Sequence, residues 1–270
     1  MILRYFPTWT VIALGLLLTT GCEQFSSKTV AQMCQENPEF CSDLNPDSWC
    51  RAEKADIIKH RYEHQDGLSH RDQYQLLVFF EGYKDCIEKA AQIRHIKLRE
   101  KETGRMKGVL TAQRELKRIA NETRNIDNPY LNYYHWSRFG SDSALRRFLN
   151  DDQAGRLTSA ELNVGLASYF AKLDNGKAIN SLYRALSLYN EEQSVDPEIF
   201  ISLYTLHTER EEVERAITWG LIGSEYESNH VDTIQLEAVA ESHGLDIDAL
   251  KDRARDLHRK IENRDFEFSP

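Results

Sequence analysis

The sequence predicts an all-α protein built of helical hairpins, with a short α-solenoid-like array in its C-terminal half and disulfides that staple its N-terminal part. Between residues 162 and 226, apolar residues recur at three- and four-residue steps, as in helices that bury one face, and do not alternate as in strands. Four cysteines follow residue 30. Hydrophobic residues make up 41% and charged residues 29% of the 270, which is typical of a globular body with one large or two small domains.

The chain begins with a segment typical of a signal peptide. Arg4 precedes the apolar run Trp9–Leu18, which is too short to span a bilayer. The run leads into Leu18-Thr-Thr-Gly-Cys22, in which small residues directly precede a cysteine, and this resembles the lipobox of bacterial lipoproteins. Thr19 departs from that pattern, because leucine is most usual there. The alternative is an ordinary secretory signal followed by a chance cysteine.

The lipobox resemblance implies cleavage before Cys22, loss of residues 1–21 and attachment of acyl chains such as palmitate to the new N-terminal cysteine. Two or more chains make such an anchor stable, at about 0.8 kcal/mol per buried CH₂. Glu23, rather than aspartate, follows the cysteine, and this favours the outer membrane with the body facing the periplasm. Residues 22–46 would then form the anchor, a polar tether and a disulfide turn.

Net charge excludes one class of partner. Cleavage removes one of the 34 basic residues and none of the 43 acidic ones, so the mature chain carries a formal charge of −10. General nucleic-acid binding needs a dominant cationic face, and we therefore expect no nucleic-acid partner.

The remaining cysteines, Cys34, Cys41, Cys50 and Cys86, are an even number in an exported chain and indicate two disulfides, for which three pairings are possible. None lies in a C-x-x-C motif, and their spacing lacks the tight pairs of a zinc site. We predict Cys34–Cys41, which would pin the turn at Asn37-Pro38, and Cys50–Cys86, which would staple two helices together.

One motif has the spacing of a zinc peptidase. Asp47-Ser48 predicts the cap of a helix that runs to about His64. This helix contains His60-Arg-Tyr-Glu-His64, a literal H-x-x-E-H, in which two histidines share a face and Glu63 could act as a base, as in the inverzincin peptidases. Those are large α/β enzymes with a further acidic ligand, which nothing here resembles. We therefore expect no metal or other cofactor, with His60 and His64 as weak candidates only.

Residues 72–99 predict the longest helix, and residues 109–124 predict a second helix that folds back against it after a break at Gly104 and Gly108. From residue 94 to residue 118, nine basic residues stand against three glutamates, a net charge of +6, while the rest of the mature chain sums to −16. We favour a solvated hairpin tip over a surface that binds anionic lipid, lipopolysaccharide, peptidoglycan or an acidic partner. The candidates for such an anionic contact are Arg94, Lys97, Arg99, Lys101, Arg105 and Lys107.

Tyr130, Tyr133, Tyr134 and Trp136 form the densest aromatic stretch, on a helix that Pro129 would begin. They cannot all point one way on a helix, so we expect some of them to pack against the hairpin and the others to reach a surface. We favour packing between two regions over sugar or peptide binding. The predicted N-terminal helical region, with the long hairpin, covers residues 47–140, and the C-terminal region covers residues 141–270.

Residues 150–161 imitate an EF-hand loop, with Asn150 and Glu161 at its first and last ligand positions. Ala154 occupies another ligand position, and no partner loop is visible. We therefore favour a turn between helices that Thr158 or Ser159 caps.

Two sets of residues, 38 positions apart, organise the C-terminal half: Ala178, Leu182 and Ala185, then Ala216, Gly220 and Gly223. Small residues on a helix face let a neighbouring helix approach closely. The pattern resembles tetratricopeptide and Sel1-type repeats, which implies helix pairs stacked into an array, while an ordinary helical bundle is the alternative. Helices at 233–242 and 246–263 would complete and cap the array, and residues 266–270 would form a loose tail.

Taken together with Trp49-Cys50, the lipobox-like Cys22 and the Cys34-x₆-Cys41 spacing resemble a family of bacterial lipoproteins of unknown function, which implies no activity. No phosphate loop, G-x-S-x-G or dinucleotide motif is present. We expect a lipid-anchored envelope scaffold or binding protein, not an enzyme, that presents helical-repeat surface to protein or peptide partners. The alternatives are a metal-dependent hydrolase using the H-x-x-E-H residues and an envelope protein that binds peptidoglycan or lipopolysaccharide through the basic hairpin.

Overall fold

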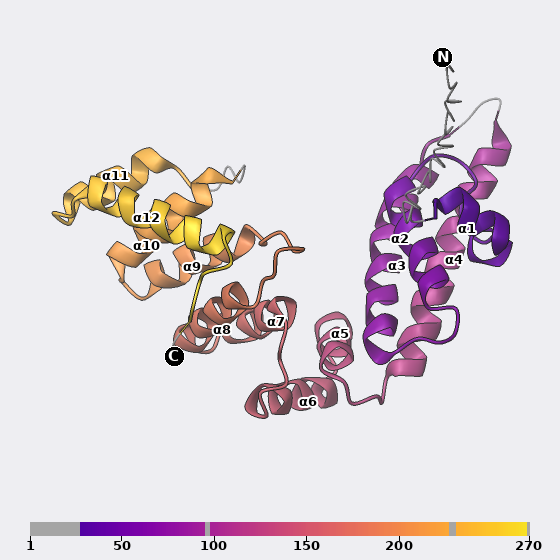
Figure 1. Cartoon of the computed structure of the whole chain (residues 1–270), viewed down its shortest axis with the longest axis horizontal. Helices are drawn as coiled ribbons and strands as arrows, with labels where there is room; N and C mark the ends of the chain where they lie inside the picture. The colour runs from indigo at the N-terminus through magenta and orange to yellow at the C-terminus, as the bar shows by residue number, and fades with distance from the viewer. Residues whose placement is uncertain (1–27, 95–97, 227–230, 269–270) are drawn as a thin grey trace, which may run out of the picture.

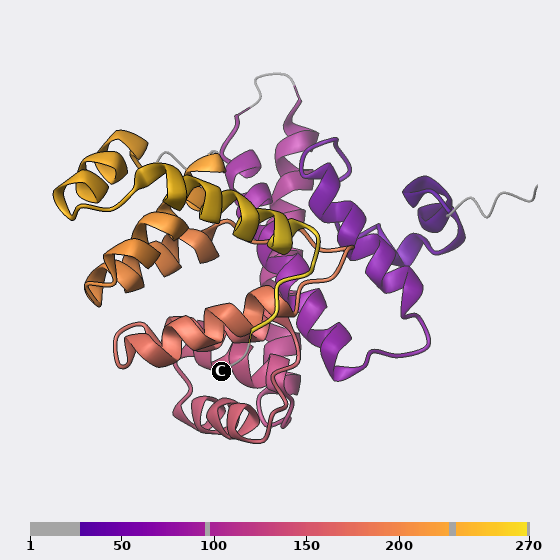
Figure 2. The ribbon, with the colours of Figure 1, turned by 60° about the vertical axis from the view of Figure 1, so that its left-hand side comes forward.

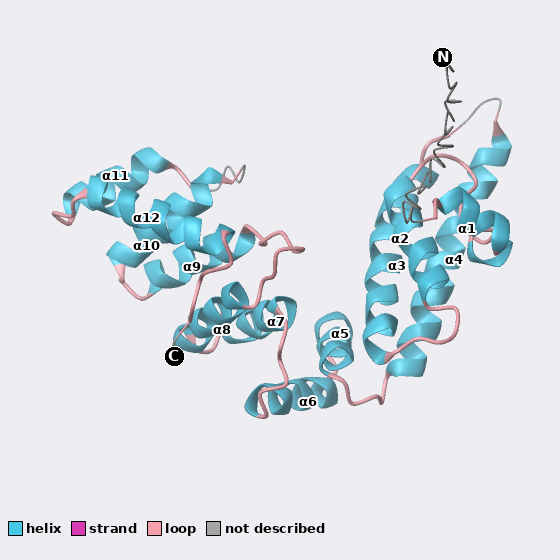
Figure 3. Cartoon of the chain, viewed as in Figure 1, coloured by secondary structure: helices cyan, strands magenta, loops and turns pink. Residues whose placement is uncertain are grey.

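The computed structural model describes residues 28–94, 98–226 and 231–268, and within these ranges the chain is all-α, as predicted (Figure 1, Figure 3). The helices are α1 Val30–Glu36, the 3₁₀ helix η1 Pro38–Phe40, α2 Arg51–Glu63, α3 His70–Ala91, α4 Arg99–Thr123, α5 Pro129–Phe139, α6 Asp142–Gln153, α7 Ala160–Phe170, α8 Asn175–Ser187, α9 Glu198–Glu209, α10 Val213–Glu225, α11 Thr233–Ser242 and α12 Ile247–Glu262. None of the helices described has the length and apolarity to span a bilayer. The predicted signal peptide and Cys22 lie outside the described residues.

Both predicted disulfides are confirmed. Cys34–Cys41 ties α1 to the turn that follows it, and Cys50–Cys86 ties the start of α2 to α3, with Cα atoms 5.7 and 5.8 Å apart. The second bridge closes a loop of 36 residues, which on the chain-entropy model stabilises the fold by roughly 3–4 kcal/mol. The N-terminal helices are therefore held by covalent bonds as well as by a common apolar core.

The start of α2 differs from the prediction. The helix begins at Arg51, and its N-cap is Cys50, which adopts a left-handed conformation with φ of 55°. Asp47, the predicted cap, instead accepts hydrogen bonds from the Trp49 backbone and from Arg105 of α4. The Asp47 carboxylate therefore pairs with Arg105, which is distant in sequence, and does not cap α2 as predicted.

The long hairpin is present, but its break lies elsewhere. α3 ends at Ala91, and α4 begins at Arg99 and continues through Gly104 and Gly108. A Cβ atom added at Gly104 would lie 2.7 Å from Pro46 Cδ, and one at Gly108 would overlap the Tyr83 hydroxyl. Both glycines therefore permit close packing and do not end a helix.

Aromatic residues of α5 pack between the two groups of helices, as predicted. Tyr130 lies against Tyr74 of α3 at a ring-centroid distance of 5.3 Å, while Trp136 lies against Phe148 of α6 at 5.8 Å. On α7, Gly165 leaves the space that the Tyr133 ring fills. Figure 1 shows α5 and α6 joining α1–α4 to α7–α12.

Helices α7 to α10 pack as two consecutive pairs, and α11 and α12 cover α10 (Figure 1). Ala178, Leu182 and Ala185 are buried in the core of this array. Gly220 approaches Leu236 of α11, and Gly223 approaches Ile201 of α9. The small residues therefore lie where helices meet, as a stacked array requires.

We expect Gly108→Ala to lower the free energy of unfolding by about 1–3 kcal/mol, because the added methyl group would overlap Tyr83. Urea denaturation followed by circular dichroism would measure the change. Gly82→Ala in α3 is the matched control, since an added Cβ meets nothing within 4 Å there, and it should be neutral or stabilising by up to about 1 kcal/mol. Equal stabilities for the two variants would contradict the packing role of Gly108.

Candidate peptide-binding site

His60 of α2 and His64, which caps the end of that helix, have ring centroids 4.4 Å apart and lie beside a cavity of about 320 Å³. His60 Nε2 donates to the Asp72 backbone oxygen at 2.9 Å, and His64 Nδ1 donates to the His60 backbone oxygen at 2.9 Å. His64 Nε2 lies 3.3 Å from the Asp72 carboxylate. Three of the four ring nitrogens thus face oxygen acceptors, and a nitrogen that donates a hydrogen has no lone pair for a metal. Burial, together with the adjacent His64, lowers the pKa of His60.

Within the described ranges, one group of three possible ligands is close enough to share an ion, and it does not include the two histidines. It comprises Cys50, Glu53 and Cys86, but the two cysteines are joined in a disulfide. A disulfide sulfur is not a thiolate and does not offer the ligand that zinc needs.

The EF-hand-like segment consists of a helix end and a turn. Asp152 belongs to α6 and pairs with Arg184 of α8 at 3.0 Å. Glu161 belongs to α7 and accepts a hydrogen bond from the Tyr74 hydroxyl of α3. Ser159, one of the two predicted caps, caps α7. These two carboxylates therefore bind partners on different helices and do not converge on a common point.

The basic residues predicted as an anionic contact differ in their exposure. Arg94, Arg99 and Lys107 are exposed and Lys101 is half-buried, whereas Lys97 lies outside the described residues.

Arg105 corrects the prediction of an anionic contact, because its side chain is only 2% exposed. It donates to the Asp47 carboxylate at 2.7 Å and to the Ala90 backbone oxygen at 2.9 Å. A buried and paired guanidinium cannot reach an external anion.

A pocket of about 530 Å³ lies between α8, α10, α12 and the C-terminal segment. Its lining consists of aromatic, apolar and basic side chains: Tyr183, Arg215, Thr218, Trp219, Arg253, Leu257, Phe266, Glu267 and Phe268. The Tyr183 and Trp219 rings lie 5.7 Å apart between centroids and form one wall. Pockets of this size with a few polar groups are typical of ligand sites.

A chain of hydrogen bonds fixes the wall of this pocket. Trp219 Nε1 donates to the Tyr183 hydroxyl at 3.2 Å, and that hydroxyl lies 2.8 Å from His207 Nε2. His207 Nδ1 lies 2.7 Å from the Glu212 carboxylate. The consistent assignment has Tyr183 donating to His207 and His207 donating to Glu212, which satisfies every member.

The pKa values follow from this arrangement. Burial lowers the pKa of His207 against the opposing effect of Glu212, and so favours the neutral ring. Burial alone would raise the pKa of Glu212, but hydrogen bonds from Arg210 and His207 outweigh it and hold that pKa at about 2. Burial also raises the pKa of Tyr183, which keeps its hydroxyl protonated.

A carboxylate–imidazole–hydroxyl series is also found in hydrolytic triads. Here the Tyr183 oxygen accepts from Trp219 while its proton is directed to His207, so both functions of the hydroxyl are engaged. We therefore assign the series to the positioning of the aromatic wall. No sequence motif indicated it, because its members lie on α8, α9 and α10 and in the turn between the last two.

The C-terminal segment, residues 264–268, forms the facing wall, and the prediction of a loose tail is wrong for its residues 266–268. Phe266 and Phe268 lie 6.2 and 5.6 Å from the Tyr183 ring, between centroids. Arg264 holds the start of the segment, because its Nε donates to the Asn190 backbone oxygen at 2.9 Å. Figure 2 shows the segment running from the end of α12 across α8.

The described residues thus define an all-helical protein with stacked helix pairs and a pocket that its own C-terminal segment partly covers. The chain belongs to the family described as "Protein of unknown function (DUF2989)", whose model matches residues 19–221. The match includes Cys22 and all four disulfide cysteines and ends within α10. Searches of curated proteins and of solved structures found no match.

We expect stability to fall as the pH is lowered from about 7 to about 5, and His207→Gln to reduce this slope. The pKa of His207 is lowered in the folded state, so below about pH 6.5 the unfolded chain binds a proton that the folded chain excludes. Urea midpoints at the two pH values would measure the slope. A slope equal in wild type and His207→Gln would contradict the assignment.

Proposed function

We propose that this chain is a lipid-anchored envelope protein whose C-terminal helix pairs bind an extended peptide segment of a partner protein. The anchor is Cys22: the lipobox-like residues before it support its acylation, and Glu23 after it supports outer-membrane attachment facing the periplasm. The stacking of α7–α10 supports a tetratricopeptide-like array, which commonly serves to bind other proteins. We propose no catalytic activity.

One observation carries the binding proposal: a non-helical peptide segment already lies on the pocket. Phe266 and Phe268 are two residues apart and both contact Tyr183, which is how an extended segment presents alternate side chains to one surface. The segment lies against side chains of α8, α10 and α12, so a partner segment of similar chemistry would meet the same wall.

The lining also indicates the chemistry of the partner. Arg215 and Arg253 line the pocket beside the aromatic wall, and Glu267 lies between the two phenylalanines in sequence. Arginine and aromatic side chains commonly dominate binding energy at protein interfaces. We therefore expect a partner segment with aromatic residues at alternate positions and an acidic residue between them.

A peptide with the sequence of residues 264–270 should bind the full-length Phe266→Ala/Phe268→Ala variant with roughly micromolar affinity. Wild type should bind it at least about tenfold more weakly, because its own segment competes at a high effective concentration. Fluorescence anisotropy of a labelled peptide would measure both affinities.

The control is the same peptide with both phenylalanines replaced by alanine, which should not bind. Equal binding of the two peptides, or no gain in the protein variant, would show that the pocket does not accept an extended segment.

The anchor has a separate test. In membranes of a bacterium with the lipoprotein-processing enzymes, mass spectrometry should find a diacylated or triacylated Cys22 at the N-terminus, and Cys22→Ser should release the chain from the membrane. An unmodified Cys22 in the membrane fraction would refute the anchor and leave the pocket proposal standing.

A further inference from the structure

Large apolar side chains are exposed around the end of the α3–α4 hairpin. Ile93 and Leu98 flank the tip with exposed fractions of 40% and 41%, and Met106 and Leu110 of α4 are exposed by 49% and 57%. Met106 and Leu110 are four residues apart and share a helix face. Together with Ala91 they line a groove of about 940 Å³.

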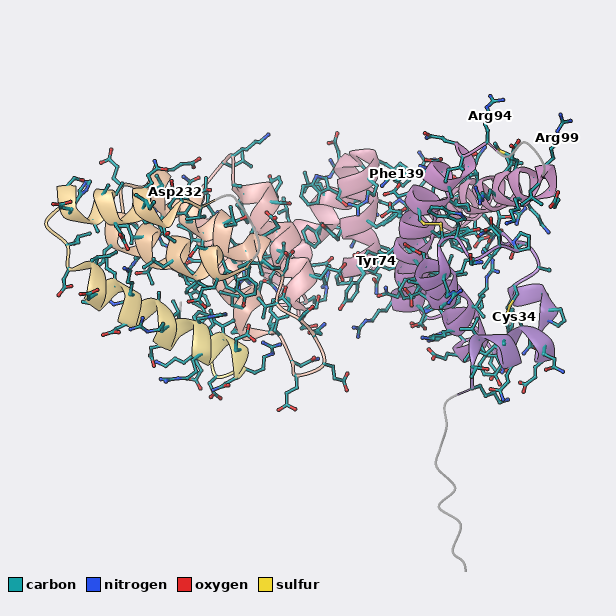
Figure 4. All side chains as sticks on the ribbon, turned by 90° about the horizontal axis from the view of Figure 1, so that it is seen from above. Cys34, Tyr74, Arg94, Arg99, Phe139 and Asp232 are labelled. Carbon is teal, nitrogen blue, oxygen red and sulfur yellow. A yellow bond between two sulfur atoms is a disulfide. The ribbon has the colours of Figure 1, made fainter. Side chains whose placement is uncertain are left out.

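Basic side chains border the same groove. Arg94, Lys107 and Arg114 line it, and Arg99 lies at the start of α4. Within the described ranges no ion pair is found for Arg94 or Arg99, whereas Arg114 lies 3.6 Å from Asp43. Figure 4 shows Arg94 and Arg99 pointing away from the body of the protein. Exposed apolar groups with cations at their margin are typical of surfaces that enter a bilayer interface.

We propose that this end of the hairpin docks on the anionic headgroup surface of a lipid bilayer. Arg94, Arg99 and Lys107 would contact lipid phosphates, and Met106 and Leu110 would enter the interface below them. Because residues 94–118 carry a net charge of +6 and the rest of the mature chain −16, an anionic surface would attract this end and repel the remainder. The charge distribution would therefore orient the protein.

The chain outside the described structure favours a bilayer over an acidic protein as the occupant. Lys28 lies six positions after Cys22, so a tether from an acylated cysteine reaches at most about 21 Å. Beyond Lys28, Cys34–Cys41 ties α1 to the turn that includes Ser42 and Asp43, and Lys107 donates to the Ser42 backbone oxygen. The tether therefore leads directly into the segment that the Cys34–Cys41 disulfide holds at one wall of the groove. The tether length bears on the proposal only if Cys22 is the anchor, whereas the charges and the exposed apolar side chains of the hairpin do not depend on it.

The test uses the chain from residue 22 onward with Cys22→Ser, so that no acyl group contributes to binding. It should sediment with phosphatidylcholine–phosphatidylglycerol vesicles, remain in solution with phosphatidylcholine vesicles, and dissociate as salt is raised. Arg94→Glu/Leu110→Ser should lower the partition coefficient by at least about tenfold, since each basic residue near the surface contributes roughly fivefold.

Lys172→Glu/Leu173→Ser is the matched control, with the same changes at an exposed pair in the turn between α7 and α8, and it should bind like wild type. Circular dichroism would confirm that both variants fold. Absence of binding to the anionic vesicles, equal partition of the two variants, or capture by isolated peptidoglycan or acidic peptides instead of vesicles would overturn the proposal. Neither Cys22 acylation nor the peptide pocket enters this measurement, so its failure would leave those proposals untouched.

Discussion

The ion pair between buried Arg105 and half-buried Asp47 is the interaction on which the N-terminal half depends. Its guanidinium joins three elements, because it belongs to α4, binds the carboxylate of the segment before α2 and donates to the Ala90 backbone oxygen near the end of α3. Burial raises the pKa of the Asp47 carboxyl, but hydrogen bonds from Arg105 and Asn45 outweigh that effect and leave it lowered. Removing Asp47 would leave the buried Arg105 charge uncompensated, which is strongly destabilising.

The same ion pair explains why Arg105 is buried while other basic residues of the hairpin are exposed. The stapled loop before α2 covers one face of α4, and Gly104 and Gly108 allow it and Tyr83 to approach that face closely. Arg105 lies on the covered face and is neutralised there, exposed Lys107 lies at the margin with a hydrogen bond to the Ser42 backbone oxygen, and Met106 and Leu110 remain on the uncovered face. A contiguous exposed surface with both charge and apolar area is therefore a consequence of where the disulfide-held loop packs.

Sequence patterns predicted the helices, both disulfides and the aromatic junction, because each depends on local periodicity or on covalent chemistry. Three predictions were wrong for one common reason: that Asp47 caps α2, that the hairpin breaks at Gly104 and that Arg105 is exposed. Each residue has a local preference that a partner distant in sequence overrides, as when Asp47 binds a cation 58 residues away. The candidate peptide site was missed for the same reason, since Tyr183, Trp219 and Phe266 come from three segments, and none belongs to a recognisable motif. The anchor at Cys22 is a sequence inference alone and lies outside the described residues.

The two proposed surfaces lie on different groups of helices. The hairpin groove is formed by α3 and α4, and the pocket is formed by α8, α10 and α12, with α5 and α6 between them (Figure 1). The junction is more than a flexible linker, because Tyr74 of α3 donates to Glu161 of α7 and the Tyr133 ring fills the space beside Gly165. Burial raises the pKa of Tyr74, so its hydroxyl stays protonated and keeps donating across the junction. With the α3–α4 hairpin on a bilayer, this junction would hold the C-terminal array, and therefore the pocket, at a fixed position relative to the membrane. A bound peptide segment of a second envelope protein would then be held at that position as well.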